Sequence, residues 1–223
     1  MSSTAPRCIA LLGGSFDPVH NGHVALASLF AKLLVPDELR ILPAGNPWQK
    51  DGMQASPADR IEMARRAFAG QAVPVVIDEQ EIFCSTPTYT IETLRALRRE
   101  LGPQPAIVFL LGADQLLRLD TWREWQSLFD YASIAAASRP GFSIDTLQLP
   151  PAVAREFARR AATPSQLRST AHGLTYLASN LAVDVAATEI RDLLQNGAPD
   201  SALAPLIPAS VLDYIQQHNL YKS

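Results

Sequence analysis

The chain has 223 residues, 48% of them hydrophobic and 18% charged, which is enough apolar material to bury a core and excludes an intrinsically disordered chain. Its formal net charge of −3 argues against a nucleic-acid-binding surface, and its apolar runs fall short of the roughly 20 residues of a membrane span. Two cysteines give no disulfide framework and no secretory signal precedes the first apolar run, so we expect a cytoplasmic protein.

Apolar periodicity predicts strands and helices that alternate along the chain. Continuous apolar runs of strand length indicate strands that are buried on both faces of a parallel sheet. Such strands are predicted over residues 7–12, 39–42, 73–77, 106–111, 131–137, 174–177 and 182–185. Helices are predicted over residues 22–34, 56–70, 90–101, 121–128, 152–162, 188–195 and 208–217.

Several of these helices have recognisable ends. Ser56 followed by Pro57 is a typical helix start, Thr121 is expected to cap the short helix that carries two tryptophans, and Thr188 is expected to start the helix over 188–195. Residues 142–173 are less regular apart from their one helix. The alternation of elements predicts an α/β fold with a doubly wound, Rossmann-like parallel sheet, whose ligand binds at the carboxyl ends of the strands.

The most informative segment is the run Gly-Gly-Ser-Phe-Asp-Pro-Val-His-Asn-Gly-His over residues 13–23. It joins the first predicted strand to the first predicted helix. Gly13 and Gly14 allow a close approach of the backbone to a ligand, and the first turn of a helix presents unpaired amides and the positive end of its dipole. His20 and His23 add donors on one face of that helix. The pattern indicates a phosphate site.

Other interpretations of the two histidines are weaker. A lone pair at this spacing is usually a surface pair or half of a metal site, but no further ligands occur at metal-binding spacing. We therefore predict no metal site built from protein side chains. The Walker and dinucleotide glycine patterns are absent as well. Asp17 and Pro18 are expected to shape the turn, because a carboxylate beside phosphates would repel them.

These residues resemble the GG[ST]FDPxHxGH signature of the bacterial nicotinate mononucleotide adenylyltransferases, in the HxGH nucleotidyltransferase superfamily. Further segments resemble the same family in the same order along nearly the whole chain. They are NPWQK at 46–50, PTYTIETL at 87–94, GAD at 112–114, the tryptophan segment at 122–125, SRPG at 138–141 and ATEIR at 187–191. The resemblance implies transfer of the adenylyl group of ATP to nicotinate mononucleotide, giving nicotinate adenine dinucleotide and pyrophosphate in NAD biosynthesis.

The resemblance also implies the roles of individual residues. The catalytic residues would be His20, His23, Lys50 and Arg191. ATP would bind to Gly13, Gly14, Ser15, Phe16, His20, His23, Gly112, Asp114, Arg139, Thr188 and Arg191, with Mg²⁺ entering with the nucleotide. Nicotinate mononucleotide would bind to Ser15, Lys50, Thr90 and Trp122, whereas Trp125 is expected to pack in the core. We expect one nucleotidyltransferase domain over residues 1–223, in which residues 186–223 complete the phosphate site, and a monomer or homodimer.

The chain departs from the family pattern at two places. Ala186 replaces the usual serine of the C-terminal motif, which removes one hydroxyl, and Trp48 and Gln49 replace a proline and a histidine before Lys50. Alternatives therefore remain: the same reaction with nicotinamide mononucleotide, another HxGH nucleotidyltransferase, or a nucleotide-binding sensor that has lost catalysis.

Overall fold

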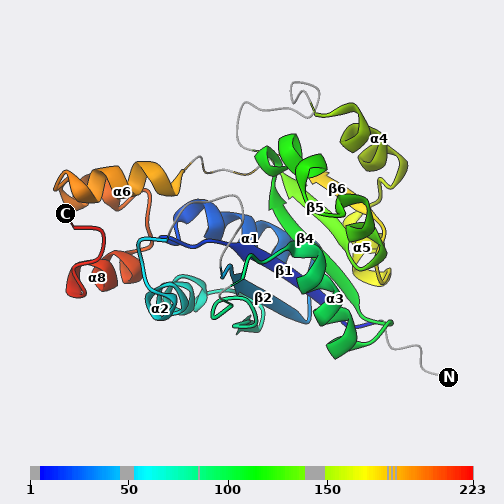
Figure 1. The fold of residues 1–223 in the computed structure, drawn as a ribbon, viewed down its shortest axis with the longest axis horizontal. Coiled ribbons are helices and arrows are strands. Elements are labelled where there is room, and N and C mark those ends of the chain that lie inside the picture. The colour runs from blue at the N-terminus through cyan, green and yellow to red at the C-terminus, as the bar shows by residue number, and fades with distance from the viewer. Residues whose placement is uncertain are drawn as a thin grey trace.

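The computed structural model describes residues 6–45, 53–84, 86–138, 149–179, 181, 183 and 185–222. Its centre is a parallel sheet in the order β3-β2-β1-β4-β5-β6 (Figure 1). The strands are β1 (Cys8–Gly14), β2 (Glu38–Pro43), β3 (Val75–Ile77), β4 (Ala106–Gly112), β5 (Ser133–Ala137) and β6 (Thr175–Ala178). The chain leaves the sheet in one direction after β1 and in the other after β3, so the doubly wound α/β prediction is confirmed.

Helices cover both faces of this sheet. The α-helices are α1 (Asn21–Leu34), α2 (Pro57–Phe68), α3 (Thr90–Leu101), α4 (Pro151–Arg159), α5 (Pro164–Ser169), α6 (Ala187–Gln195), α7 (Asp200–Leu203) and α8 (Ala209–Gln217). Two 3₁₀ segments, η1 (Ala113–Thr121) and η2 (Trp125–Asp130), follow β4. One core cluster joins the sheet to α1, α2, α5 and the C-terminal helices, and a second joins its other face to α3, α4, η1 and η2.

Strand alternation explains how one strand supplies both cores. In β1, Ala10 and Leu12 belong to the first cluster and Leu11 to the second, and all three are buried. Helix starts follow local sequence rules as well. The Ser56 side chain accepts a hydrogen bond from the backbone N–H of Asp59, with Pro57 at the first helical position, as predicted.

The segment after β4 differs from its prediction. Thr121 does not cap a helix that carries both tryptophans, because it ends η1 and its hydroxyl donates to the carbonyl of Arg118 over 2.7 Å. A second segment, η2, begins only at Trp125, after Glu124 adopts a left-handed backbone with φ of 50°. The chain therefore turns between Trp122 and Trp125, which separates their environments.

Three further boundaries differ from the prediction. The helix predicted over 152–162 ends at Arg159 and is followed by α5, where Thr163 and Gln166 form a reciprocal capping box. Helix α6 begins one residue before Thr188, with Ala186 at its N-cap. The strand predicted over 182–185 is wrong for its two described residues, Val183 and Val185, which lie outside any strand.

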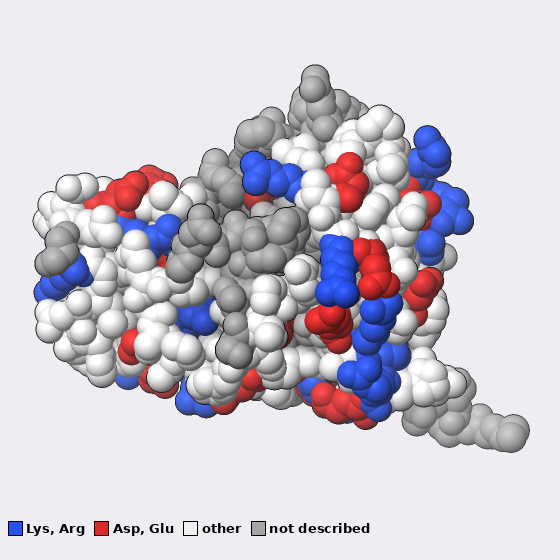
Figure 2. Space-filling model, in the orientation of Figure 1, with Lys and Arg blue, Asp and Glu red and all other residues white. Residues whose placement is uncertain are grey.

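The surface carries charges of both signs. In Figure 2, acidic and basic side chains lie interspersed over α3 and the segment beside it, where Arg95 pairs with Glu124 and Arg123 with Glu92. Among the described residues, no helix has both the length and the apolar character that crossing a membrane requires.

Candidate active site

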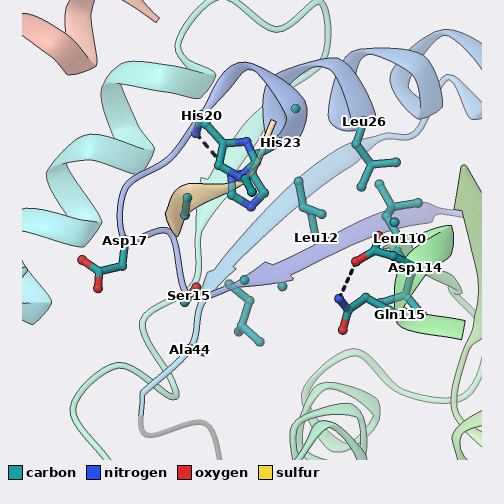
Figure 3. Close-up of a pocket in the computed structure, with 18 of the residues that line it drawn as sticks. Leu12, Ser15, Asp17, His20, His23, Leu26, Ala44, Leu110, Asp114 and Gln115 are labelled. Atoms are coloured by element: carbon teal, nitrogen blue, oxygen red, sulfur yellow. Dashed lines mark hydrogen bonds between the residues drawn. The ribbon is translucent and has the colours of Figure 1, made fainter. Parts of the chain in front are cut away.

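A cavity of about 660 Å³ opens at the carboxyl ends of β1 and β4. These two strands are neighbours in the sheet, and the chain direction reverses between them, which is where doubly wound folds bind ligands. The end of β1, the start of α1, the start of η1 and the start of α6 all contribute to the cavity wall. Figure 3 shows His20 and His23 on one side and Asp114 with Gln115 on the other.

The two histidines lie in this cavity wall at the first turn of α1. His20 is the N-cap residue, and its backbone N–H donates to Nδ1 of His23 over 3.2 Å (Figure 3). Because Nδ1 accepts this bond, a neutral His23 ring carries its proton at Nε2. The rings are stacked, with centroids 3.6 Å apart. Gly22 permits this arrangement, since a Cβ there would lie 3.0 Å from Nδ1 of His20.

The glycine turn before the histidines is held by an aromatic ring. Gly13, Gly14 and Ser15 line the cavity. A Cβ on Gly14 would come within 2.9 Å of the Phe16 ring, so this position requires glycine. Phe16 itself is buried, has a left-handed φ of 50°, and packs edge-on against His23 with ring centroids 5.0 Å apart. Its side chain does not reach the cavity, so the predicted contact with ATP concerns its backbone amide.

Helix α6 brings the C-terminal motif to the same cavity. Thr188 and Arg191 line it, and Arg191 Nη2 donates to the Thr188 hydroxyl over 3.3 Å. Arg191 Nη1 donates to the backbone carbonyl of Asp17 over 2.7 Å, which ties α6 to the turn before His20. The N-cap, Ala186, provides no side-chain hydrogen bond to the first turn of α6. Segments about 170 residues apart in the sequence therefore meet here.

The opposite wall contains the residues predicted for nicotinate mononucleotide. Thr90 and Trp122 both line the cavity, and Trp122 packs edge-on against Phe109 with ring centroids 6.3 Å apart. The indole Nε1 of Trp122 is buried and has no hydrogen-bond partner within the protein. Trp125 instead packs against Phe129 in the second core, which agrees with the role predicted for it.

A buried carboxylate in this wall was not predicted. Glu81 lines the cavity and accepts a hydrogen bond from the Thr93 hydroxyl. Burial raises the pKa of Glu81, and hydrogen bonds from Thr93, Thr88 and the backbone of Gly45 partly oppose that rise. Its sequence offers no signal of this role, because Glu81 lies in an irregular segment and its partners are distant in the chain.

Comparison with known proteins identifies the family. A family model described as cytidylyltransferase-like matches residues 11–193. A protein of Herminiimonas arsenicoxydans named "probable nicotinate-nucleotide adenylyltransferase" is 64% identical over 97% of this chain and 98% of its own length. A protein of Laribacter hongkongensis with the same name is 44% identical over 98% of this chain and 96% of its own length. The chain belongs to the nicotinate-nucleotide adenylyltransferase family.

A solved structure supports the fold of this adenylyltransferase. The nicotinic acid mononucleotide adenylyltransferase of Plasmodium falciparum, complexed with NaAD, aligns with a TM-score of 0.74 over 96% of this chain and 97% of its own. Its sequence identity is 19%, so this likeness concerns the fold alone. The sequence-based assignment to the adenylyltransferase family is confirmed, and the assignment to another HxGH family is not supported.

The remaining predicted residues of the adenylyltransferase site fall into two groups. Gly112 and Asp114 line the cavity, and a Cβ on Gly112 would lie 2.5 Å from Oδ1 of Asp114, so glycine makes room for this carboxylate. Lys50 and Arg139 lie outside the described residues. Within the described part of the chain, no group of three or more His, Cys, Asp or Glu side chains could hold a metal ion.

Proposed function

We propose that the cavity between β1 and β4 is the active site in which this nicotinate-nucleotide adenylyltransferase transfers the adenylyl group of ATP to nicotinate mononucleotide. One observation carries this assignment. The stacked pair His20 and His23 shares a cavity with Thr188 and Arg191, although these motifs lie at opposite ends of the chain. The products are nicotinate adenine dinucleotide and pyrophosphate.

The chemistry needs no nucleophilic side chain. The phosphate of nicotinate mononucleotide attacks the α-phosphorus of ATP in line, a new P–O bond forms, and the bond to the β-phosphate oxygen breaks with its electron pair on pyrophosphate. Catalysis then consists of holding both substrates at reacting distance and stabilising the leaving oxygens. We assign the second task to His20, His23, Arg191 and Lys50, which supply imidazole, guanidinium and ammonium donors.

Backbone groups add to this site. Gly13, Gly14, Ser15 and the amide of Phe16 form the glycine turn over which the triphosphate would lie. The first turn of α6 has amides without a side-chain cap, so its positive dipole end and the Thr188 hydroxyl can face the same phosphates. Arg139 is assigned to the ATP side as well. The loss of a hydroxyl at Ala186 leaves these donors in place.

The nicotinate end is assigned to the wall that contains Thr90 and Trp122. The indole face of Trp122 can stack on the pyridine ring, and its Nε1 is a buried donor in need of a partner. Ser15 and Lys50 would contact the mononucleotide phosphate. This arrangement favours the acid over the amide, and a comparison of turnover with nicotinate and nicotinamide mononucleotides tests it.

The residues fit an Mg²⁺ ion that enters with ATP. Asp114 offers one carboxylate in the cavity wall, and Mg²⁺ typically takes one or two carboxylates, substrate phosphate oxygens and water. When bound, the ion neutralises charge that develops on the leaving pyrophosphate. We also place the enzyme in the cytoplasm as a monomer or homodimer of one domain. Cys8 and Cys84 are both free thiols, as expected in a reducing compartment.

The assay is pyrophosphate release from ATP on addition of nicotinate mononucleotide. His20→Ala should lower the rate of the chemical step by roughly two to four orders of magnitude, because a transition-state donor is lost. His218→Ala is the control, since this exposed histidine stacks on Tyr214 outside the cavity. Unchanged turnover in His20→Ala would refute the assignment of His20. ATP binding without any pyrophosphate release by the unaltered protein would instead favour a sensor.

A further inference from the structure

The end of the chain reaches back to the turn that precedes the histidines. The hydroxyl of Tyr221 donates to Oδ1 of Asp17 over 2.7 Å, across a separation of 204 residues. Both side chains are buried, with 7% of Tyr221 and 4% of Asp17 exposed. Asn219 and Tyr221 have left-handed backbones, with φ of 51° and 61°. Such conformations are unfavourable for residues other than glycine and persist where other contacts compensate them.

Asp17 connects several segments around the proposed triphosphate site. Its carboxylate also accepts the backbone N–H groups of Gln54 and Ala55, over 2.9 and 3.0 Å. Its backbone carbonyl accepts the guanidinium of Arg191. In Figure 3 the Asp17 carboxylate points away from the two histidines. Asp17 therefore acts on the site through the position of its neighbours rather than by contact with phosphate.

A buried arginine provides the counter-charge for this cluster. Arg60 on α2 is only 1% exposed, and its Nη1 donates to the backbone carbonyls of Ser15 and Ala44. Burial lowers the pKa of Arg60, and the negative charge of Asp17 opposes that change. The turn over residues 15–17 is thus held from α2, from α6 and from the C-terminal tail at once.

We propose that Tyr221 is a positioning residue of the transferase, which fixes the turn before His20 and the guanidinium of Arg191 relative to each other through Asp17. We call the Tyr221–Asp17 contact the tail latch. Seating of the C-terminal tail then completes the triphosphate site. This inference rests on the proposed assignment of that site to His20 and Arg191.

The test compares two tyrosines that each donate to an aspartate. Tyr221→Phe removes only the hydroxyl of the tail latch. Tyr214→Phe is the matched control, because the Tyr214 hydroxyl donates to Oδ1 of Asp59 over 2.9 Å and joins α8 to α2 without touching the turn. We expect Tyr221→Phe to lower kcat/KM for ATP by about tenfold to hundredfold, as a small misplacement of catalytic groups does. KM for nicotinate mononucleotide should stay unchanged, as should all kinetic constants of Tyr214→Phe.

Amide hydrogen exchange gives a readout that does not depend on activity. Exchange over residues 15–23 should be faster in Tyr221→Phe than in the unaltered chain, and not in Tyr214→Phe. Kinetic constants of Tyr221→Phe equal to those of the unaltered enzyme, measured well below Tm, would overturn the inference. An equal loss of kcat/KM in both variants would also overturn it, because the loss would then reflect general stability.

His20→Ala, run in the same assay, separates the two ideas. If His20→Ala retains full activity, the proposed triphosphate site is wrong. If His20→Ala is inactive while Tyr221→Phe behaves as the unaltered enzyme, the site stands and the tail latch is wrong.

Discussion

Replacement of Arg60 by methionine should strongly destabilise the protein. Arg60 is among the largest fully buried side chains, and its Nη1 donates to the carbonyl oxygens of Ser15 at 2.9 Å and Ala44 at 2.5 Å. Methionine fills a similar volume but leaves both carbonyls without this donor and removes the counter-charge of Asp17. Each hydrogen bond from a charged donor contributes about 1.5–3 kcal/mol. The desolvation cost of the guanidinium disappears at the same time and offsets part of this loss.

We therefore expect Arg60→Met to lower the free energy of unfolding by about 3 kcal/mol, which corresponds to about 6–12 °C in Tm for a chain of this size. Urea unfolding followed by circular dichroism measures the change. Arg65→Met is the control on the same helix, because the Arg65 side chain is 56% exposed and its pair with Glu79 should contribute at most about 1 kcal/mol. Equal unfolding midpoints for the two variants would refute the reasoning.

Three smaller perturbations test other parts of the structure. Burial raises the pKa of Glu81, so its contribution to stability is present below the unfolded pKa of about 4.3 and is lost as pH rises through the raised value. Glu81→Gln should therefore gain in unfolding midpoint relative to the unaltered chain as pH rises from about 4 to 8, and parallel pH profiles would contradict this. Ser56→Ala should cost about 1 kcal/mol in urea unfolding through loss of the α2 cap, and no loss would show that the cap is dispensable. Gly45→Ala should cost about 1–3 kcal/mol in the same assay, because its Cβ would lie 1.9 Å from the carbonyl oxygen of Glu81; wild-type stability would mean that this close approach is not maintained.

Local sequence rules predicted most of the sheet and its helices. Buried parallel strands such as β4 are continuous apolar runs, and α3 has the predicted bounds because Gly102 ends it. The turn between η1 and η2 was missed because a left-handed Glu124 has no composition signal. Helix α5 was missed although Thr163 and Gln166 form a capping box that the sequence could have revealed.

The site was predictable where its chemistry lies within a short motif. The glycine turn and the histidines occupy eleven consecutive residues, and Thr188 and Arg191 lie one helical turn apart. The supporting contacts of Arg60 and Tyr221 were not predictable, because they join the turn to residues 45 and 204 positions away. No local period encodes such pairs, and only the folded chain brings them together.

The most direct test of the account is a crystal structure of the enzyme with a non-hydrolysable ATP analogue and nicotinate mononucleotide. We predict that triphosphate oxygens lie within hydrogen-bond distance, about 2.7–3.2 Å, of the imidazole nitrogens of His20 and His23 and of the Arg191 guanidinium. A triphosphate bound outside the cavity between β1 and β4, with these three side chains making no contact to either nucleotide, would contradict the account.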